Sequence, residues 1–143
     1  MSSEQQIEVY RQHRTAQDKY VYFLLAAAGA AIGFAVSQTQ GAKLSCSQIP
    51  LGFAVGLWAF SFFFGCKHLG YVASTLFANM ALLKVEAGEH PDYMAAASAG
   101  IRSAIESNSN WASRFARWQF GSLVLGAIFY LGWHIYEMWL RAS

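Results

Sequence analysis

The chain has 143 residues, of which 55% are hydrophobic, 16% are aromatic and only 13% are charged. The charged fraction is about half that of an ordinary soluble domain, so composition argues against that class and favours an integral membrane protein. The formal net charge of +2 is too small to indicate a nucleic-acid-binding protein.

Three apolar segments are each about long enough to cross a bilayer as a helix, which needs roughly 20 residues. They are residues 20–37, 50–66 and 118–140. We therefore predict an all-α polytopic membrane protein whose three transmembrane helices are extended by cytoplasmic helical segments at 1–19 and 67–117, in a single membrane domain, residues 1–143. The residues before the first span include three acidic side chains, so we expect a retained anchor and not a cleaved signal peptide.

The distribution of lysine and arginine predicts the orientation. Eight of the ten lie in the N-terminal tail or in 67–117, and only Lys43 and Arg141 lie elsewhere. By the positive-inside rule the N-terminus and 67–117 are cytoplasmic and the C-terminus is outside, which we assign to a bacterial inner membrane. Cys46 and Cys66 then lie on opposite sides and cannot form a disulfide within one chain.

Two long helices are expected in the first two thirds of the chain. Residues 1–20 start with serines and continue without glycine or proline into the first span, which predicts a polar helix fused to that span. That polar helix is either a solvated tail or a binding surface. Residues 49–86 start next to Pro50 and contain no later proline, so we predict one helix that crosses the membrane and continues beyond Lys67.

Small residues at four-residue spacing in the first two spans predict close helix contacts, either within the chain or with another copy. These residues are Gly29, Gly33, Gly52 and Gly56. The cytoplasmic part of the second helix is apolar on more than one face, and it needs a cover. The cover could be the N-terminal helix, the start of the last helix or a second copy. We expect a homo-oligomer that buries Leu76, Phe77, Met80 and Leu83.

A turn is predicted at 87–93, where Gly88 can end one helix and Pro91 can begin the next. The tripeptide His90-Pro91-Asp92 is similar to the signature of J-domain co-chaperones, but the preceding residues lack the strongly basic helix of that family, so no function is carried over. We expect a short helix at 91–107 and a new helix from about Trp111, capped by the serines and asparagines before it. An interfacial, lipid-headgroup anchor is predicted from Lys67, Trp111, Arg114, Arg117 and Trp118.

The sequence contains no glycine-rich phosphate loop, nucleophile elbow or zinc signature, and its four histidines are not grouped. We therefore expect no catalytic residues, no cofactor, no metal and no enzyme activity. The first hypothesis is a self-assembling membrane protein that forms a pore or perturbs the membrane, with a cytoplasmic helical collar. Weakly polar residues could line that pore or bond to backbone: Ser37, Ser61, Ser122 and Tyr130. The alternative is an accessory or assembly subunit of a larger membrane complex, with other membrane subunits and lipid as partners.

Overall fold

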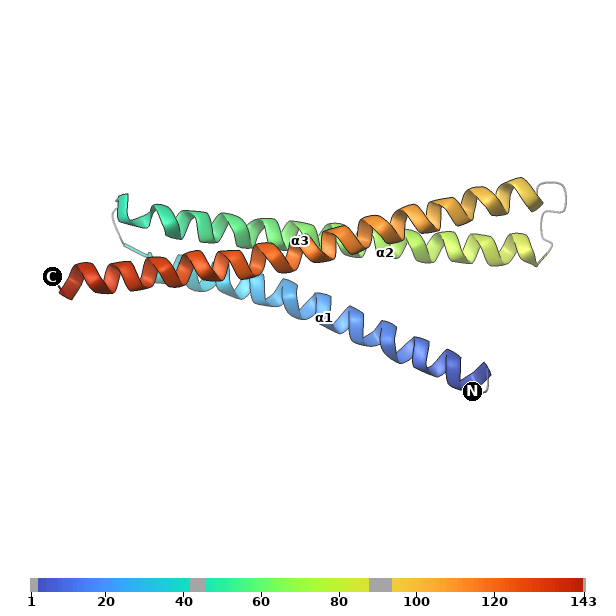
Figure 1. The fold of residues 1–143 in the computed structure, drawn as a ribbon, viewed down its shortest axis with the longest axis horizontal. Helices are drawn as coiled ribbons and strands as arrows, with labels where there is room; N and C mark the ends of the chain where they lie inside the picture. Colours follow the sequence, from blue (N-terminus) through green and yellow to red (C-terminus); the bar gives the residue numbers. More distant parts are fainter. Residues whose placement is uncertain (1–2, 42–45, 88–93, 143) are drawn as a thin grey trace. The chain divides into compact units, whose positions relative to one another are not determined.

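The computed structural model describes residues 3–41, 46–87 and 94–142, and these residues are almost entirely helical (Figure 1). The elements are three α-helices and one short 3-10 helix: α1 (Ser3–Gln38), η1 (Cys46–Gln48), α2 (Ile49–Glu86) and α3 (Met94–Ala142). No strand occurs among the described residues. The predicted all-α class is confirmed.

Each of the three helices contains a segment that is long and apolar enough to cross a membrane, by length and composition. The three segments are compatible with the predicted membrane localisation. The polar tail and the first span form one helix, α1, as predicted. On its polar part Arg11 pairs with Glu8 at 2.7 Å and the Gln12 amide donates to the same carboxylate at 3.0 Å, which are contacts between neighbouring helical turns.

The prediction of one helix over 49–86 is confirmed by α2. The prediction of two helices in the last third is wrong, because α3 is continuous from Met94 to Ala142. Residues 101–120 contain neither glycine nor proline, and serine or asparagine inside a helix costs at most about 0.7 kcal/mol relative to alanine. Across the predicted break, the Ser113 hydroxyl donates back to the Ser109 carbonyl at 3.0 Å, a contact between successive turns of one continuous helix.

The contacts divide the chain into two compact units, and both contain parts of α2 and α3. The first unit consists of residues 1–62 and 119–143. Its core is a cluster of Ala35 from α1 with Leu51, Ala54 and Trp58 from α2. Nearer the N-terminus of α1, Val21, Leu24 and Ala28 are also buried. Together with Ala35 they recur at spacings of three, four and seven, so one stripe of α1 is buried.

The turn after α1 needs a left-handed backbone conformation at residue 41. Gly41 has a φ of 82°, in the left-handed region where a glycine has no Cβ to clash. Thr39 also turns back, because its hydroxyl reaches the Ala35 carbonyl at 3.0 Å and the Val36 carbonyl at 3.1 Å. These interactions satisfy carbonyls at the helix end that have no partner within the helix.

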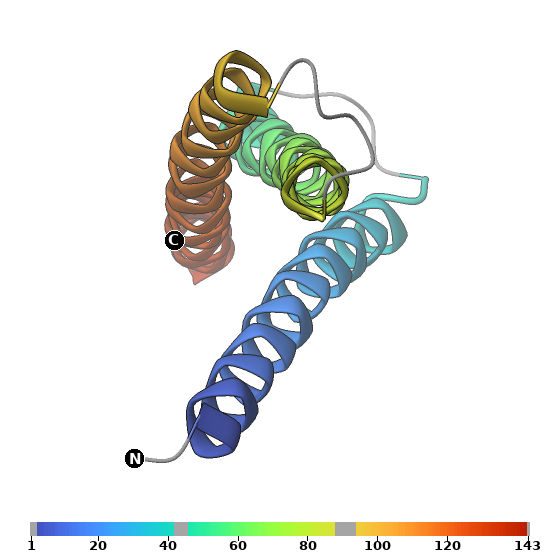
Figure 2. The same ribbon diagram turned by 90° about the vertical axis from the view of Figure 1, so that its right-hand side faces the viewer.

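The second unit consists of residues 63–118, in which α2 and α3 run antiparallel (Figure 2). Aromatic rings fill the space between the two helices. Tyr71 of α2 stacks on Phe115 and on Trp111 of α3, with ring centroids 5.5 and 6.4 Å apart. Phe64 meets Phe115 and Trp118 at 6.0 and 5.4 Å. Such pairs contribute roughly 0.5–1.5 kcal/mol each beyond the area they bury.

Candidate functional site

In the first unit, polar side chains of α2 bond to the backbone of α3. The Trp58 indole Nε1–H donates to the Leu123 carbonyl at 3.3 Å, and the Ser61 hydroxyl donates to the Gln119 carbonyl at 2.8 Å. Ser61 is fully buried and Trp58 is 5% exposed. A hydroxyl that is buried in a membrane interior without a hydrogen-bond partner costs several kcal/mol. Because these side chains have partners, they can lie between the two helices without that cost.

Gln119 is the unusual group of this region. Its residue is fully buried, yet neither its amide nitrogen nor its amide oxygen has a hydrogen-bond partner. Its backbone carbonyl, by contrast, accepts the Ser61 hydroxyl. Leaving buried polar atoms unpaired costs about 1–3 kcal/mol. The unpaired amide of Gln119 therefore lowers the stability of the folded helix pair.

In the second unit the same kind of bond is made by a histidine. His68 Nδ1 lies 2.8 Å from the Ala112 carbonyl oxygen. A carbonyl can only accept, so Nδ1 carries the hydrogen in this contact. At the far end of the unit, Arg102 of α3 pairs with Glu86 of α2 at 2.9 Å, with both side chains well exposed. The ion pair contributes little to stability because water screens it.

The four predicted packing glycines have open space where a side chain would stand. A Cβ built at Gly29, Gly33, Gly52 or Gly56 would have no atom within 4 Å. These positions therefore have room for a partner helix, and whether it belongs to the same chain or to another copy stays a prediction. Two helices do approach closely at Gly126, which the sequence analysis did not select.

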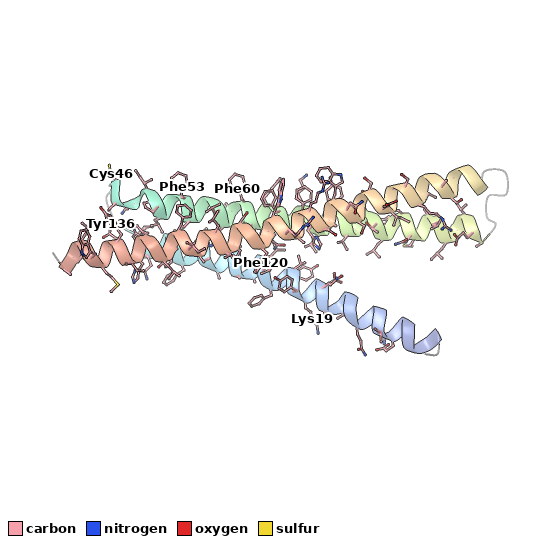
Figure 3. The ribbon with its side chains drawn as sticks, viewed as in Figure 1. Lys19, Cys46, Phe53, Phe60, Phe120 and Tyr136 are labelled. Atoms are coloured by element: carbon pink, nitrogen blue, oxygen red, sulfur yellow. The ribbon has the colours of Figure 1, made fainter. Side chains whose placement is uncertain are left out.

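Gly52 and Gly56 instead lie in an open apolar groove on α2. The groove has a volume of about 320 Å³ and is lined by Ile49, Gly52, Phe53, Gly56, Leu57 and Phe60. Phe53 and Phe60, which are 60% and 59% exposed, project from the same side of α2 (Figure 3). The glycines leave a hollow between larger apolar side chains, a shape that accepts a neighbouring helix. We call this surface the glycine groove.

The apolar residues predicted to need a cover remain exposed in the second unit. The exposed fractions are 40% for Leu76, 73% for Phe77, 58% for Met80 and 65% for Leu83. Within the unit, α3 covers a different face of α2, the one that carries Tyr71 and His68. We call these four residues the apolar face of α2.

Three of the predicted interfacial residues from α3 gather in the second unit. The Arg114 guanidinium lies 5.2 Å from the centroid of the Trp111 ring, and Trp118 meets Phe115 at 6.2 Å. On α2, Lys67 Nζ lies 5.7 Å from the Phe63 ring centroid. Arg117 is exposed. The cations thus lie over aromatic rings, an arrangement that suits a membrane–water boundary.

Two of the four weakly polar residues proposed for a pore bond to backbone. Besides Ser61, the Ser37 hydroxyl donates to the Phe34 carbonyl at 2.8 Å. Tyr130 is half-buried and its ring packs 5.7 Å from Trp58. These three side chains therefore have structural roles in the first unit.

Other predicted features concern cysteines, the turn and metal ligands. Cys46 and Cys66 are both free and exposed. The turn with Gly88, His90, Pro91 and Asp92 lies outside the described residues. Over the residues that are described, no three His, Cys, Asp or Glu side chains are grouped so that they could hold a metal ion.

Sequence reasoning missed the residues that join α2 to α3. Trp58, Ser61 and His68 recur at spacings of three and seven, which places them on one side of α2. That pattern of polar atoms in an apolar helix could have indicated an interhelical seam. The partner groups are backbone carbonyls, however, and these leave no signal in a sequence.

No model of a known protein family matches the chain, and no curated protein or solved structure has significant similarity to it.

Proposed function

We propose that this chain is a non-enzymatic integral membrane protein that assembles with further copies of itself through α2. The observation that carries the proposal is the apolar face of α2, whose four large side chains are 40–73% exposed. They lie at positions 76, 77, 80 and 83 and form one stripe along the helix. The stripe lies in the segment that the charge distribution assigns to the cytoplasm, where water would contact it.

Burying such a stripe is favourable because each large apolar side chain contributes about 1.5–3 kcal/mol when it is fully removed from water. An identical helix presents an identical stripe, so a second copy supplies a complementary surface without any other partner. The polar tail of α1 is a poor cover, since its charged residues, such as Glu8 and Arg11, pair with each other.

The glycine groove supports association within the bilayer by a different force. Lipid tails already satisfy apolar surfaces, so helices associate there mainly through close van der Waals packing. Gly52 and Gly56 provide the hollow that allows such an approach. The two surfaces on α2 would thus act together, one inside the membrane and one in the cytoplasm.

For the assembly we propose that the cytoplasmic parts of α2 and α3 form a helical collar and that the spans enclose a pore or perturb the membrane. The N-terminus would be cytoplasmic and the C-terminus outside, in a bacterial inner membrane. Ser37 and Ser61 would not line the pore, because their hydroxyls bond to backbone. Release of an encapsulated dye from liposomes containing the purified protein tests this activity.

The second candidate is an accessory subunit of a larger membrane complex. The same apolar face favours it, because a different membrane protein could cover these residues equally well. The two functions differ in one measurable property: a self-assembling protein is oligomeric when it is purified alone.

The deciding experiment is a mass measurement of the full chain in mild detergent over a range of concentrations. We expect an oligomer for the natural sequence, and dissociation or failure to accumulate for the double variant Leu76→Asp and Leu83→Asp, because charges cannot be buried unpaired. The matched control is Ser103→Asp with Ser107→Asp, which places two charges at exposed positions of α3 in the same unit. A natural protein that stays monomeric and folded would overturn self-assembly and leave the accessory subunit.

A further inference from the structure

A second cavity of the first unit lies where α1 ends and α3 approaches its C-terminus. Its volume is about 210 Å³. The lining comes from three elements: Gln38 and Thr39 at the end of α1, Gln48 of η1, and Tyr130, Trp133, His134, Glu137, Met138 and Arg141 of α3. Polar and charged groups at the ends of apolar helices belong at the membrane–water boundary.

The aromatic wall of this pocket is held by packing. The Tyr130 ring lies 6.1 Å from Phe34 of α1 and 5.7 Å from Trp58 of α2, so contacts with both other helices fix its position. Trp133 lies 5.7 Å from Tyr130, and the His134 ring is stacked nearly parallel to Tyr130 at 6.3 Å. An electron-rich ring face attracts a cation that comes within about 6 Å of its centroid.

The charged groups of the pocket form a loose pair. Arg141 Nε lies 3.9 Å from Glu137 Oε2, which is too long for a hydrogen bond. The Arg141 side chain is 82% exposed, whereas the Glu137 side chain is only 21% exposed. A carboxylate that is mostly withdrawn from water and whose cationic partner is distant can bind a second cation that donates a shorter hydrogen bond.

Trp133 also has an unused polar atom. Its indole Nε1 is buried and has no hydrogen-bond partner. An indole N–H can only donate, and a buried donor without an acceptor costs about the same as a lost hydrogen bond. The pocket therefore offers Glu137 and the ring faces to a cation. It offers the Arg141 guanidinium, and the buried Trp133 N–H after a turn of the indole, as donors to a hydrogen-bond acceptor.

We propose that this pocket binds the headgroup of a zwitterionic phospholipid. The ammonium would lie against Glu137 and the rings of Tyr130 and Trp133. The phosphodiester would accept from Arg141, and also from Trp133 Nε1–H once the indole turns this buried atom toward the ligand. Such a ligand replaces the loose Glu137–Arg141 pair by two closer contacts of opposite sign. The inference requires the chain to lie in a membrane, and it is independent of self-assembly.

Size and charge select this class of ligand. The volume of about 210 Å³ is smaller than the roughly 300–1,000 Å³ of pockets that enclose a drug-sized molecule. A compact polar headgroup fits, while its acyl chains stay outside in the bilayer. An anionic headgroup without an ammonium could pair with Arg141 but would bring no cation to the Glu137 carboxylate, and its negative charge near that partly buried carboxylate is unfavourable.

The test measures binding of defined lipids to the full chain after it has been purified and delipidated in detergent. Native mass spectrometry would follow titration with dioleoyl phosphatidylethanolamine, phosphatidylcholine or phosphatidylglycerol. We expect both zwitterionic lipids to bind and phosphatidylglycerol to bind roughly tenfold more weakly, since the first two alone can make the charge-assisted contact to Glu137. Preference for phosphatidylethanolamine would identify hydrogen bonding to Glu137 as the main cation contact, and preference for phosphatidylcholine would identify the rings.

The variant Glu137→Gln keeps the side-chain shape and should weaken binding of the zwitterionic lipids by roughly tenfold, and Trp133→Phe should weaken it by a smaller factor. The matched control is Glu86→Gln, which removes the carboxylate of an exposed arginine pair away from the pocket, with Arg102 in the second unit, and should leave lipid binding unchanged. Thermal unfolding of each variant shows whether it is folded, and Arg141→Gln provides a second pocket variant if Glu137→Gln unfolds. Equal binding of phosphatidylglycerol, no retained lipid, or undiminished binding to a folded pocket variant would overturn the proposal.

Discussion

The Trp58 indole occupies the space beside Gly126 that any larger residue would need. A Cβ at Gly126 would lie 2.6 Å from Trp58 Nε1 and 2.7 Å from Trp58 Cδ1, and 3.1 Å from the Ala54 carbonyl oxygen. The indole cannot move away freely, because Nε1 also donates to the Leu123 carbonyl at 3.3 Å. Trp58 can therefore pack between the helices only because residue 126 of α3 is a glycine.

The first prediction follows from that contact. Gly126→Ala should destabilise the protein by about 1–3 kcal/mol, the usual cost of adding a methyl group to a filled core. Gly132→Ala is the control, because that position has open space and the change should be neutral or slightly stabilising. Thermal unfolding in detergent measures both, and equal melting temperatures for the two variants would contradict the contact.

The second prediction concerns the unpaired amide of Gln119. Gln119→Met preserves the length of the side chain and removes both unpaired polar atoms, so it should stabilise the protein by about 1–3 kcal/mol. The control is Gln12→Met, since Gln12 is exposed and bonded to Glu8, and little change in stability is expected there. A fall in the melting temperature of Gln119→Met would show that the amide has a partner in the folded protein.

The third prediction tests the glycine groove. Gly52→Leu together with Gly56→Leu should reduce the oligomer mass, because leucines fill the hollow and keep helix backbones apart. Both positions are open, so the chain itself can accept the larger side chains. The pair Gly121→Leu and Gly132→Leu places equally large residues at open positions of α3 and should leave the mass unchanged. An unaltered mass for the groove variant would mean that this surface faces lipid.

The fourth prediction addresses orientation. A membrane-impermeant thiol reagent added to intact cells should label Cys46 and should label Cys66 only after the membrane is opened. Both thiols are exposed on the surface of the chain, so the chain itself does not shield them. Labelling of Cys66 after the membrane is opened shows that lipid does not shield it either. Single variants Cys46→Ser and Cys66→Ser assign the signal. Labelling of Cys66 alone from outside would reverse the topology.

Helix content and the extent of α1 and α2 could be predicted from sequence because the signals are local. Apolar runs, the absence of internal proline and the position of Pro50 determine where a helix can run. The break expected before Trp111 was wrong because serine and asparagine are good caps but are also tolerated inside a helix that is held by its neighbours. In α3 those neighbours include Tyr71 and His68 on α2.

The pairing of the helices could not be predicted in the same way. Gly126 looks like any other glycine of the chain, and only the position of Trp58 on another helix distinguishes it. The aromatic residues near Arg114 were predicted as an interfacial group from their composition, and the structure adds that Trp111 and Phe115 stack on Tyr71. The pocket at Glu137 depends on the ends of α1 and α3 being adjacent, which no local pattern encodes.

The hydrogen bonds from Trp58, Ser61 and His68 should make α2 less tolerant of substitution than α3 at the positions that form these bonds. In each unit the donor is a side chain of α2, while the acceptor is a main-chain oxygen of α3. A carbonyl is present whatever the amino acid, so mutations at Leu123 or Ala112 preserve these bonds as long as the new side chain fits. In a saturation mutagenesis experiment, the donor positions should accept few alternatives and the acceptor positions many. The relative position of α2 and α3 therefore depends mainly on the amino acids of α2.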